Sequence, residues 1–210
     1  MTNSSFDRDD VEVLKRETVY QGFYRLDRYE LRHRLFAGGF GAAIDREVLE
    51  RGDAVAVLPY DPVRDEVVMI EQFRIGGYVN GEAAWMLEIP AGAVDDGEHA
   101  EAAARREALE EASLHLSQLW PVLRYYSSPG TLSERIIVYC APVDASGAGG
   151  VHGLDDENED IRVVVVPFAD AMAAIDDGRI VASPAVIALQ WLALNRDRLR
   201  NEQRDMRAPA

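Results

Sequence analysis

Three glutamates in the stretch RREALEEAS, residues 105–113, have a spacing that could hold a metal ion. Glu107 stands three and four residues before Glu110 and Glu111, so a helix would bring the three carboxylates to one side. Carboxylates about 4 Å apart repel each other by about 4 kcal/mol at an effective dielectric constant of about 20. A divalent cation would convert that repulsion into attraction. The stretch is therefore a candidate Mg²⁺ site, able to activate water for attack on a phosphoryl group.

The alternative is a solvated helix face, which is the usual role of a run of charges. A solvated face favours mixed glutamate–lysine pairs, and residues 99–114 contain no lysine. That alternative also leaves unexplained why the run follows the segment WMLEIPAG, a strand and a tight Pro-Ala-Gly turn. The pattern favours the metal site.

The overall charge of the chain limits the classes of ligand. The 22 basic residues against 37 acidic residues give a net charge of −15. A protein that reads a nucleic-acid backbone needs a basic stripe, so we expect no nucleic-acid partner. A phosphate-bearing small molecule would also be repelled unless cations bridged it to the protein.

Length and composition indicate one globular domain with a small appended lobe. The 210 residues are 48% hydrophobic. No run of eighteen apolar residues occurs, so we expect no membrane span, and residues 1–17 do not have the pattern of a secretory signal. Cys140, the only cysteine, lies in RIIVYCAPV and is expected to be an inert core thiol. We therefore expect a cytoplasmic protein without disulfides.

The elements that would position the glutamates follow from the hydrophobic periodicity. Residues 18–36 alternate apolar with charged side chains, which predicts antiparallel strands with one covered face. DAVAVLPYD, EVVMIEQFRI, RIIVYCAPV and IRVVVVPF predict further strands. A helix is expected over about residues 99–114, where an alanine every fourth residue suits close packing on a sheet.

The last third of the chain is predicted to hold a long loop and two helices. The glycine-rich segment 145–160 has a length that is usual for functional or mobile loops. One helix is expected over residues 167–177, and Ser183 is expected to cap another. From Arg196 onward the polar tail is expected to fray.

Gly92, Glu98 and the run REALEEA at 106–112 resemble the signature of the Nudix hydrolases. That signature is a glycine, five residues, a glutamate, seven residues and then R-E-U-x-E-E-x-G-U, where U is apolar. Every position fits except the final glycine, where this chain has Ser113. We expect this departure to affect the end of the helix and not the chemistry.

The resemblance continues from about residue 15 to residue 200. Five segments are similar to those of the bacterial ADP-ribose pyrophosphatase branch: YQGFYRLDRYELRHRLF, REVLERG, LPYDPVRDEVVMIEQFRI, SSPGTLSER and DENEDIRV. In that branch a proline follows the signature, and Pro129 lies 129 − 113 = 16 residues after the glycine position. Alone, Ser-Pro-Gly would simply be a turn.

The resemblance implies the Nudix fold, an α/β fold with a mixed β-sheet sandwiched between helices and an N-terminal antiparallel β lobe. We expect residues 1–50 to form that lobe, residues 51–200 to form the hydrolase domain and residues 201–210 to be a frayed tail. The resemblance also implies a homodimer in which the N-terminal lobes are exchanged or interleaved.

The resemblance further implies a role for each residue of the motif and for the acidic loop. The expected metal ligands are the Ala91 carbonyl, Glu107, Glu111 and Glu159; the catalytic residues are Glu157, as general base, and Glu110, as a further acidic or water-mediated contact; and the structural residues are Gly92, Glu98 and Arg106. The loop DDENEDI could instead be a solvated turn. It does not fit a calcium loop, because the sixth position from Asp156 is Ile161 rather than glycine.

Substrate contacts are implied for four residues outside the motif. Arg74 resembles an arginine that contacts substrate, and Ser128 lies in the matching substrate loop. Phe23 and Arg46 resemble contacts supplied to the site of the partner subunit, where an aromatic ring stacks on adenine. Ordinary strand packing for Phe23 and exposed surface for the arginines are the alternatives. The four histidines lack ligand spacing.

The expected function is hydrolysis of ADP-ribose to AMP and ribose 5-phosphate, with two or three Mg²⁺ or Mn²⁺ ions per site. One alternative is the same chemistry on another nucleoside diphosphate sugar, such as GDP-mannose. Another is a non-catalytic ADP-ribose sensor, against which the complete set of glutamates argues.

Overall fold

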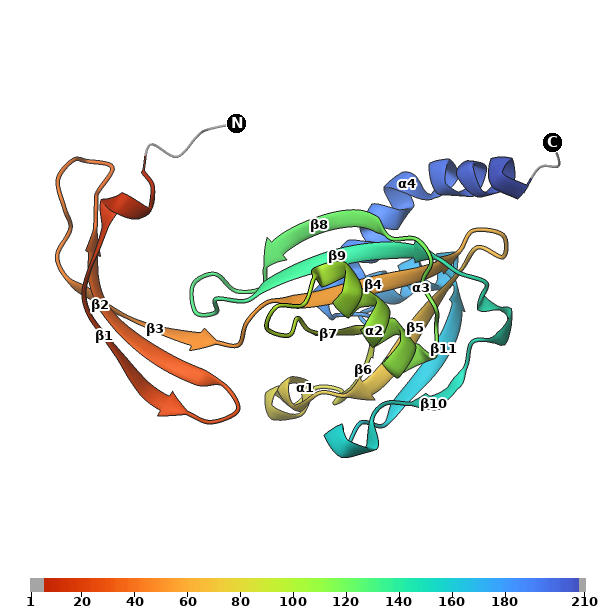
Figure 1. Cartoon of the computed structure of the whole chain (residues 1–210), viewed down its shortest axis with the longest axis horizontal. Helices are drawn as coiled ribbons and strands as arrows, with labels where there is room; N and C mark the ends of the chain where they lie inside the picture. The colour runs from red at the N-terminus through yellow and green to blue at the C-terminus, as the bar shows by residue number, and fades with distance from the viewer. Residues whose placement is uncertain (1–5, 208–210) are drawn as a thin grey trace. The chain divides into compact units, whose positions relative to one another are not determined.

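The computed structural model describes residues 6–207, with side chains described through residue 202. The chain divides into two compact units, each with its own sheet (Figure 1). The first unit contains the described part of residues 1–52 together with Tyr126–Arg135. The second contains Asp53–Tyr125 and the described residues from Ile136 onward.

The first unit is built on a three-stranded antiparallel sheet, as the alternation of its sequence predicted. Its elements are the 3₁₀ turn η1 (Arg8–Asp10) and the strands β1 (Val11–Gln21), β2 (Arg25–His33) and β3 (Ile44–Glu50), in the order β1-β2-β3. Asp27 on β2 is fully buried, and its carboxylate accepts hydrogen bonds from Arg16 at 2.6 Å and Thr18 at 2.7 Å. These bonds join β1 to β2 through side chains as well as backbone.

The second unit contains a mixed sheet with β4 at its centre. The strands are β4 (Ala54–Asp61), β5 (Glu66–Phe73), β6 (Trp85–Glu88), β7 (Ala91–Ala93), β8 (Trp120–Tyr126), β9 (Arg135–Pro142), β10 (Gly150–His152) and β11 (Ile161–Pro167). Their order is β10-β11-β5-β4-β9-β8, with β6 paired to β5 and β7 paired to β4. β4 runs parallel to β9 and antiparallel to β5.

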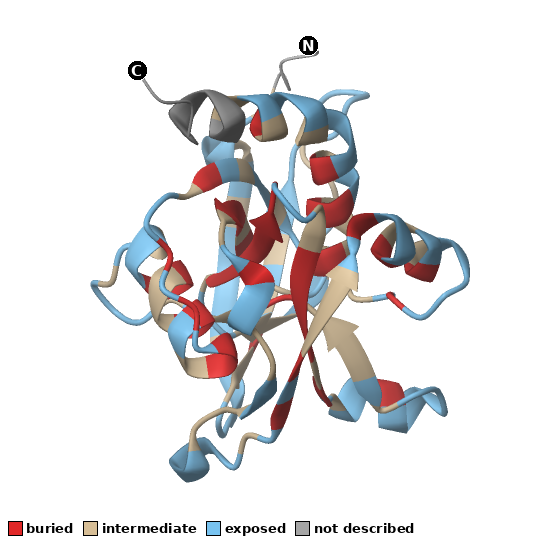
Figure 2. Ribbon diagram, turned by 90° about the vertical axis from the view of Figure 1, so that its right-hand side faces the viewer, coloured by how far each residue is buried: buried red, intermediate tan, exposed pale blue. Residues whose placement is uncertain are grey.

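Helices cover both faces of this sheet, and the burial pattern of β4 shows why. The helices are α1 (Ile75–Asn80), α2 (Ala100–Ala112), α3 (Phe168–Asp176) and α4 (Ser183–Arg207), with 3₁₀ turns η2 (Ala145–Gly147) and η3 (Asp155–Glu157). All eight residues of β4 are buried. Val55 and Val57 belong to the core beneath α2, whereas Leu58 belongs to the core beneath α3 and α4. The buried residues, red in Figure 2, lie on strands and helices alike. The predicted α/β sandwich is confirmed.

The segment 145–160 has more structure than its glycine content indicated. It contains η2, the short strand β10 and η3. β10 pairs antiparallel with β11, from Gly150↔Val163 to His152↔Ile161. Its formation depends on a neighbour that the local sequence does not reveal.

The predicted C-terminal helix is longer than its polar sequence suggested. Arg196 donates to Asp65 at 2.6 Å, and Arg200 pairs with the same carboxylate at 3.3 Å. Leu199 is fully buried. Residues 201–207 of the expected frayed tail are helical, and residues 208–210 lie outside the described part. Among the described residues, no helix has the length and apolarity to cross a membrane.

Candidate metal and active site

Helix α2 places two glutamates on its buried side. Ala104, Ala108 and Ala112 are buried against the sheet, and their small side chains let the helix backbone approach it closely. Glu107 and Glu111, four residues apart, are only 8% and 2% exposed. Carboxylates this deeply buried need a partner, because their charged form has lost its water.

Glu107 lies between an arginine and a glycine. Its Oε1 accepts a hydrogen bond from Arg106 at 2.7 Å. A Cβ atom added at Gly92 would overlap the Glu107 carboxylate, so only glycine leaves room for it against the backbone of β7. Burial, together with the charges of Glu110 and Glu159, raises the pKa of Glu107 to about 7.

Glu111 is the more deeply buried of the two. Its Oε2 accepts a hydrogen bond from the backbone N–H of Ala91 at 2.8 Å. Burial raises the pKa of Glu111 to about 8, and the charges of Glu107 and Glu159 act in the same direction. Ala91 therefore contacts the helix through its amide, and the role of its carbonyl as a metal ligand, which the family resemblance implies, stays a prediction.

Arg106 joins the remaining acidic residues of the motif. It donates to both carboxylate oxygens of Glu98, at 3.2 and 3.1 Å, and to the Ala93 carbonyl at 3.0 Å. It also donates to Glu110 at 3.2 Å. One guanidinium thus joins the loop before α2 to the helix. Its hydrogen bonds to Glu98 raise the pKa of Arg106.

These carboxylates fit a hard divalent cation. Their donors are all oxygen, which suits Mg²⁺, Ca²⁺ or Mn²⁺ better than a zinc site built on histidine and cysteine. Burial, which disfavours the charged form, is the main cause of the raised pKa values of Glu107 and Glu111, and the neighbouring carboxylates add to it. Within residues 6–202, however, no three histidine, cysteine, aspartate or glutamate side chains are already arranged as a metal cage.

The acidic loop after β10 approaches this cluster through Glu159. The Glu159 carboxylate accepts a hydrogen bond from the Leu154 N–H at 3.2 Å, and its charge raises the pKa of both Glu107 and Glu111. The loop is attached to α2 by a bond from the Gly153 N–H to the Glu110 carbonyl at 3.3 Å.

Glu157, the expected general base, occupies a different setting. It is exposed on η3, and its backbone N–H donates to the Leu154 carbonyl at 3.1 Å. In the described part of the chain, no hydrogen bond or ion pair joins its carboxylate to the α2 cluster. The structure therefore brings Glu159 into the electrostatic reach of Glu107 and Glu111, and leaves Glu157 on the surface of the same loop.

Arg74 has a partner that sequence reasoning missed. Its Nε and Nη2 atoms reach Oε2 of Glu88 at 2.9 and 2.8 Å. Glu88 had been read only as part of the strand in WMLEIPAG. In the β5–β6 register, Ile70 faces Glu88 and Gln72 faces Met86, which puts Arg74 and Glu88 on the same face of the sheet. This signal was not accessible from the sequence, because it requires knowledge of the strand pairing.

The other three expected substrate contacts lie in the first unit. Phe23 is 94% exposed and packs edge-on against Tyr24, with ring centroids 4.8 Å apart. Arg46 on β3 is exposed and donates to the Asp45 carbonyl at 2.7 Å. Ser128 is exposed, and its hydroxyl lies 3.3 Å from that of Thr131.

A buried carboxylate near Ser128 also escaped the sequence reasoning. Glu134 is 4% exposed and accepts hydrogen bonds from Ser127 at 2.6 Å and from Arg51 at 3.1 Å. The guanidinium of Arg51 lies over the ring of Tyr24, 5.4 Å from its centroid. Glu134 lies in the segment SSPGTLSER, beside the expected substrate loop, and this position was the signal in the sequence that could have drawn attention to it.

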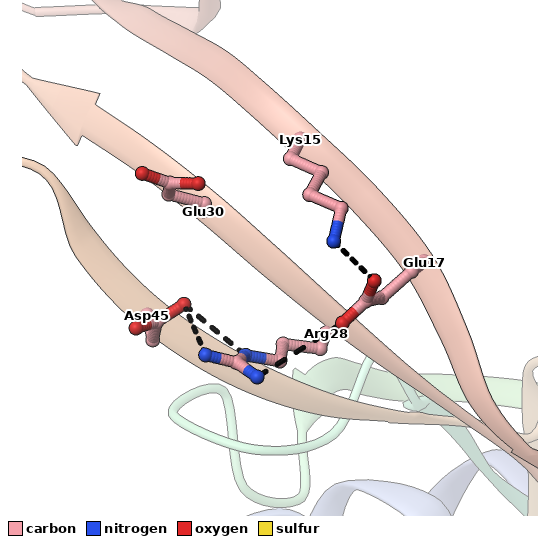
Figure 3. Close-up of a pocket in the computed structure, with 5 residues that line it drawn as sticks. All are labelled: Lys15, Glu17, Arg28, Glu30 and Asp45. Carbon is pink, nitrogen blue, oxygen red and sulfur yellow. Dashed lines mark hydrogen bonds and ion pairs between the residues drawn. The ribbon is translucent and has the colours of Figure 1, made fainter.

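Two other hollows do not have the chemistry of the α2 cluster. On the first sheet, Lys15 pairs with Glu17, and Arg28 pairs with Asp45 at 3.2 Å, around a volume of about 70 Å³ (Figure 3). This hollow has room for only a few waters, and Glu30 also lines it, so its two basic and three acidic side chains leave one net negative charge. A larger groove of about 690 Å³ lies in the second unit. Its lining includes Glu71, Trp85, Leu87, Arg162, Val164 and Val181.

That larger groove opens on the sheet face opposite the metal-site candidate. Glu71 and Leu87, which face each other across β5 and β6, alternate with Ile70 and Glu88 on the α2 side. The groove is mostly apolar, and its two arginines are already paired, Arg162 with Glu71 at 2.8 Å and Arg179 with Asp177 at 2.7 Å. The buried carboxylates of α2 are therefore the better candidate for chemistry.

Comparison with known proteins identifies the family of this chain. Residues 50–186 match the family described as NUDIX domain. The ADP-ribose pyrophosphatase of Escherichia coli (strain K12) is 50% identical over 198 residues, which cover 94% of this chain and 95% of that protein. The ADP-ribose pyrophosphatase of Haemophilus influenzae is 44% identical over 193 residues, covering 90% and 89%.

More distant relatives share the fold. The GDP-mannose pyrophosphatase of Pectobacterium atrosepticum is 34% identical over 185 residues, covering 86% of this chain and 92% of that protein. A solved structure titled as an ADP compounds hydrolase superposes with a TM-score of 0.65 at 21% identity, covering 90% of this chain and 97% of that one. With its signature assembled between α2 and β7, and its match to the family over more than half its length, the chain belongs to the Nudix family.

Proposed function

We propose that this protein is a Mg²⁺-dependent hydrolase that cleaves the diphosphate bond of ADP-ribose, giving AMP and ribose 5-phosphate. The observation that carries the proposal is the pair of buried carboxylates, Glu107 and Glu111, which stand four residues apart on α2 beside β7. The 50% identity to a relative named ADP-ribose pyrophosphatase supports the choice of substrate.

The residues divide the work of binding and catalysis. The Ala91 carbonyl, Glu107, Glu111 and Glu159 would hold the cations, two or three per site, with Mn²⁺ as a substitute for Mg²⁺. When bound there, the cations supply charge neutralisation on the diphosphate and on the departing phosphate. Arg106 keeps Glu107 and Glu110 in place through its hydrogen bonds.

Glu157 acts on the attacking water, and Arg74 acts on the substrate. The Glu157 carboxylate takes a proton from water as the water oxygen bonds to phosphorus and the bridging P–O bond breaks. Arg74 binds a phosphate oxygen, because a guanidinium donates two parallel hydrogen bonds to such groups. Closure of the loop at residues 153–160 would carry Glu157 to the attacking water once substrate is bound.

The proposal is tested by product analysis with the purified protein. ADP-ribose and GDP-mannose are supplied separately at equal concentration with Mg²⁺, and again with EDTA, and the products are separated by chromatography. We expect AMP and ribose 5-phosphate from ADP-ribose in the presence of Mg²⁺ alone. A wide preference for GDP-mannose would overturn the substrate, and ADP-ribose binding without AMP release would support a sensor.

We also propose that the protein acts as a homodimer in which Phe23 and Arg46 serve the partner's site. Support comes from large exposed apolar side chains on the first unit: Val13, Leu14, Tyr20, Phe23 and Phe36. Large exposed apolar side chains are typical of interaction surfaces. A cytoplasmic location stays a prediction from the sequence.

Subunit mixing tests the shared site. A chain carrying Phe23→Ala and Arg46→Ala is unfolded and refolded together with a chain carrying Glu111→Gln. If the site is shared, mixed dimers restore one intact site, and activity returns to about a quarter of the wild-type value. If each chain serves its own site, mixing restores nothing.

A further inference from the structure

The guanidinium of Arg74 is held by one carboxylate, that of Glu88. Its Nε and Nη2 atoms both bind Oε2 of Glu88, at 2.9 and 2.8 Å. The Glu88 side chain is 13% exposed, and Gln72 lies 3.5 Å from the same oxygen. This arrangement uses one edge of the guanidinium and leaves the other edge, with Nη1, available to a ligand.

The neighbouring carboxylates compete for the same cation. Burial lowers the pKa of Arg74, but the charge and hydrogen bond of Glu88 and the charges of Glu111 and Glu159 outweigh that effect. The fold also places this pair beside the metal-site candidate, because Glu88 stands three residues before Ala91, whose backbone N–H binds Glu111 at 2.8 Å. A guanidinium pairs strongly with carboxylates, so Arg74 released from Glu88 would be drawn toward Glu111 and Glu159.

Arg106 shows that an arginine can occupy this cluster. It already donates to Glu107 at 2.7 Å and to Glu110 at 3.2 Å. A second arginine among the same carboxylates would neutralise the charge that a cation requires. The chain therefore needs a separate acceptor for Arg74.

We propose that Glu88 is a positioning residue that holds Arg74 out of the acidic cluster. It keeps Glu111 and Glu159 available to a divalent cation and turns the free edge of the guanidinium toward the substrate diphosphate. The second part rests on the proposed function, whereas the first concerns cation binding alone. β6 is suited to this task because it pairs with β5 and leads directly into β7, where Ala91 meets Glu111.

Binding of Mn²⁺ without substrate tests the first part. Free Mn²⁺ is measured by electron paramagnetic resonance during titration of the metal-free protein, its Glu88→Gln and Arg74→Gln variants and the double variant. We expect Glu88→Gln to weaken Mn²⁺ binding about tenfold, because Arg74 then pairs with the cluster. In the Arg74→Gln background, the same substitution is expected to change binding by less than about twofold.

The double variant separates positioning from a general loss of charge. Removing the Glu88 charge also weakens the local field, but that effect would persist without Arg74. Equal weakening in both backgrounds, or no weakening in either, would overturn the proposal. Glu71→Gln is the matched control. Glu71 lies on β5 opposite Leu87 of β6 and is also paired with an arginine, Arg162, but on the opposite face of the sheet. It is expected to leave Mn²⁺ binding unchanged, and thermal unfolding checks that each variant folds.

Steady-state kinetics tests the second part. At saturating Mg²⁺, Glu88→Gln is expected to raise KM for ADP-ribose about tenfold with kcat within about threefold of wild type, because ground-state binding by Arg74 is lost. Glu88→Asp, which keeps the charge, is expected to recover part of the loss. An unchanged KM would overturn the substrate role. A wild-type protein that fails to hydrolyse ADP-ribose would overturn the proposed function, while the Mn²⁺ titration would still decide the positioning role.

Discussion

Two acidic regions of the second unit differ in almost every physical respect. On α2, Glu107 and Glu111 are buried, and their pKa values are raised to about 7 and 8. On η3, Asp155, Asp156 and Glu157 are exposed to water. The first group is crowded against a sheet and bonded to backbone and arginine, whereas the second lies on a short surface turn.

The difference indicates a division of labour. Buried carboxylates that repel one another store an electrostatic cost that a cation removes, so they are suited to bind metal tightly and in one place. An exposed carboxylate can move with its loop, so it is suited to reach the attacking water and accept its proton. Glu159 connects the two regions, because it belongs to the loop while its charge acts on Glu107 and Glu111.

The largest effect is expected from Glu111→Gln. Glutamine can still accept the hydrogen bond from the Ala91 N–H but cannot offer a charged ligand. We expect kcat/KM for ADP-ribose to fall by on the order of 10³-fold or more, with Mn²⁺ binding weakened in parallel. Glu101→Gln is the matched control, because Glu101 is exposed on the first turn of the same helix. Near-normal Mn²⁺ binding by Glu111→Gln would remove Glu111 from the metal site.

The next effect, from Glu157→Gln, should separate catalysis from metal binding. We expect kcat to fall by about 10²- to 10³-fold, because the water loses its base. Mn²⁺ affinity and thermal stability should stay at wild-type values, since Glu157 is exposed. Asp156→Asn, a neighbouring exposed change, is the control. A parallel loss of Mn²⁺ binding in Glu157→Gln would show that the loop carboxylate is a ligand and that the two regions share one task.

The pH dependence of the unfolding free energy should report on the buried carboxylates of α2 and not on the exposed ones of η3. Glu107 and Glu111 have folded pKa values above the ordinary 4.5, so the folded state binds more protons than the unfolded state between pH 4.5 and about 8. Their contribution to stability is present below pH 4.5 and is lost as pH rises through about 7 and 8. The metal-free protein should therefore lose a few kcal/mol of unfolding free energy over that range.

Urea unfolding at several pH values measures this loss. Mg²⁺ should restore stability at pH 8, because it binds the ionised carboxylates of the folded state. Glu111→Gln should flatten the pH dependence, and Glu157→Gln should leave it unchanged. A wild-type profile that rises from pH 5 to pH 8 would contradict the proposed crowding on α2.

Sequence spacing predicted the parts of the site that lie close in the chain. The helix over about 99–114, its alanine stripe and the side shared by Glu107 and Glu111 all follow from a 3.6-residue period. Contacts between distant segments could not be read in the same way. The pairing of Arg74 with Glu88 depends on the β5–β6 register, and β10 depends on β11.

The end of α4 gives the same lesson. A polar tail with many arginines was expected to fray from Arg196 onward, because local composition offers it little to bury. In the structure, Asp65 binds both Arg196 and Arg200, and Leu199 is buried. The stabilising carboxylate lies 131 residues earlier in the chain.

The smallest effect is expected at Ser113, where the signature has glycine. Ser113 ends α2 in the left-handed conformation, with φ 52° and ψ 34°. For a residue with a Cβ this conformation costs about 1 kcal/mol, which glycine would avoid. The Ser113 hydroxyl, however, lies 3.3 Å from Nδ1 of His152, and a hydrogen bond of this kind contributes about 0.5–1 kcal/mol.

The two effects nearly cancel, so Ser113→Gly should change the unfolding free energy by less than about 1 kcal/mol. Turnover should stay within about twofold of wild type, because the Glu107 and Glu111 side chains lie earlier on the helix and keep their partners. Because the His152 ring also contacts the Gly149 carbonyl at 2.8 Å, the contribution of the Ser113 bond is isolated by comparing His152→Ala in the wild-type and Ser113→Gly backgrounds. A severalfold change in turnover at unchanged stability would contradict this expectation. It would show that the conformation at the end of α2 affects the position of the loop carrying Glu157, so that Ser113 couples the buried and the exposed acidic regions.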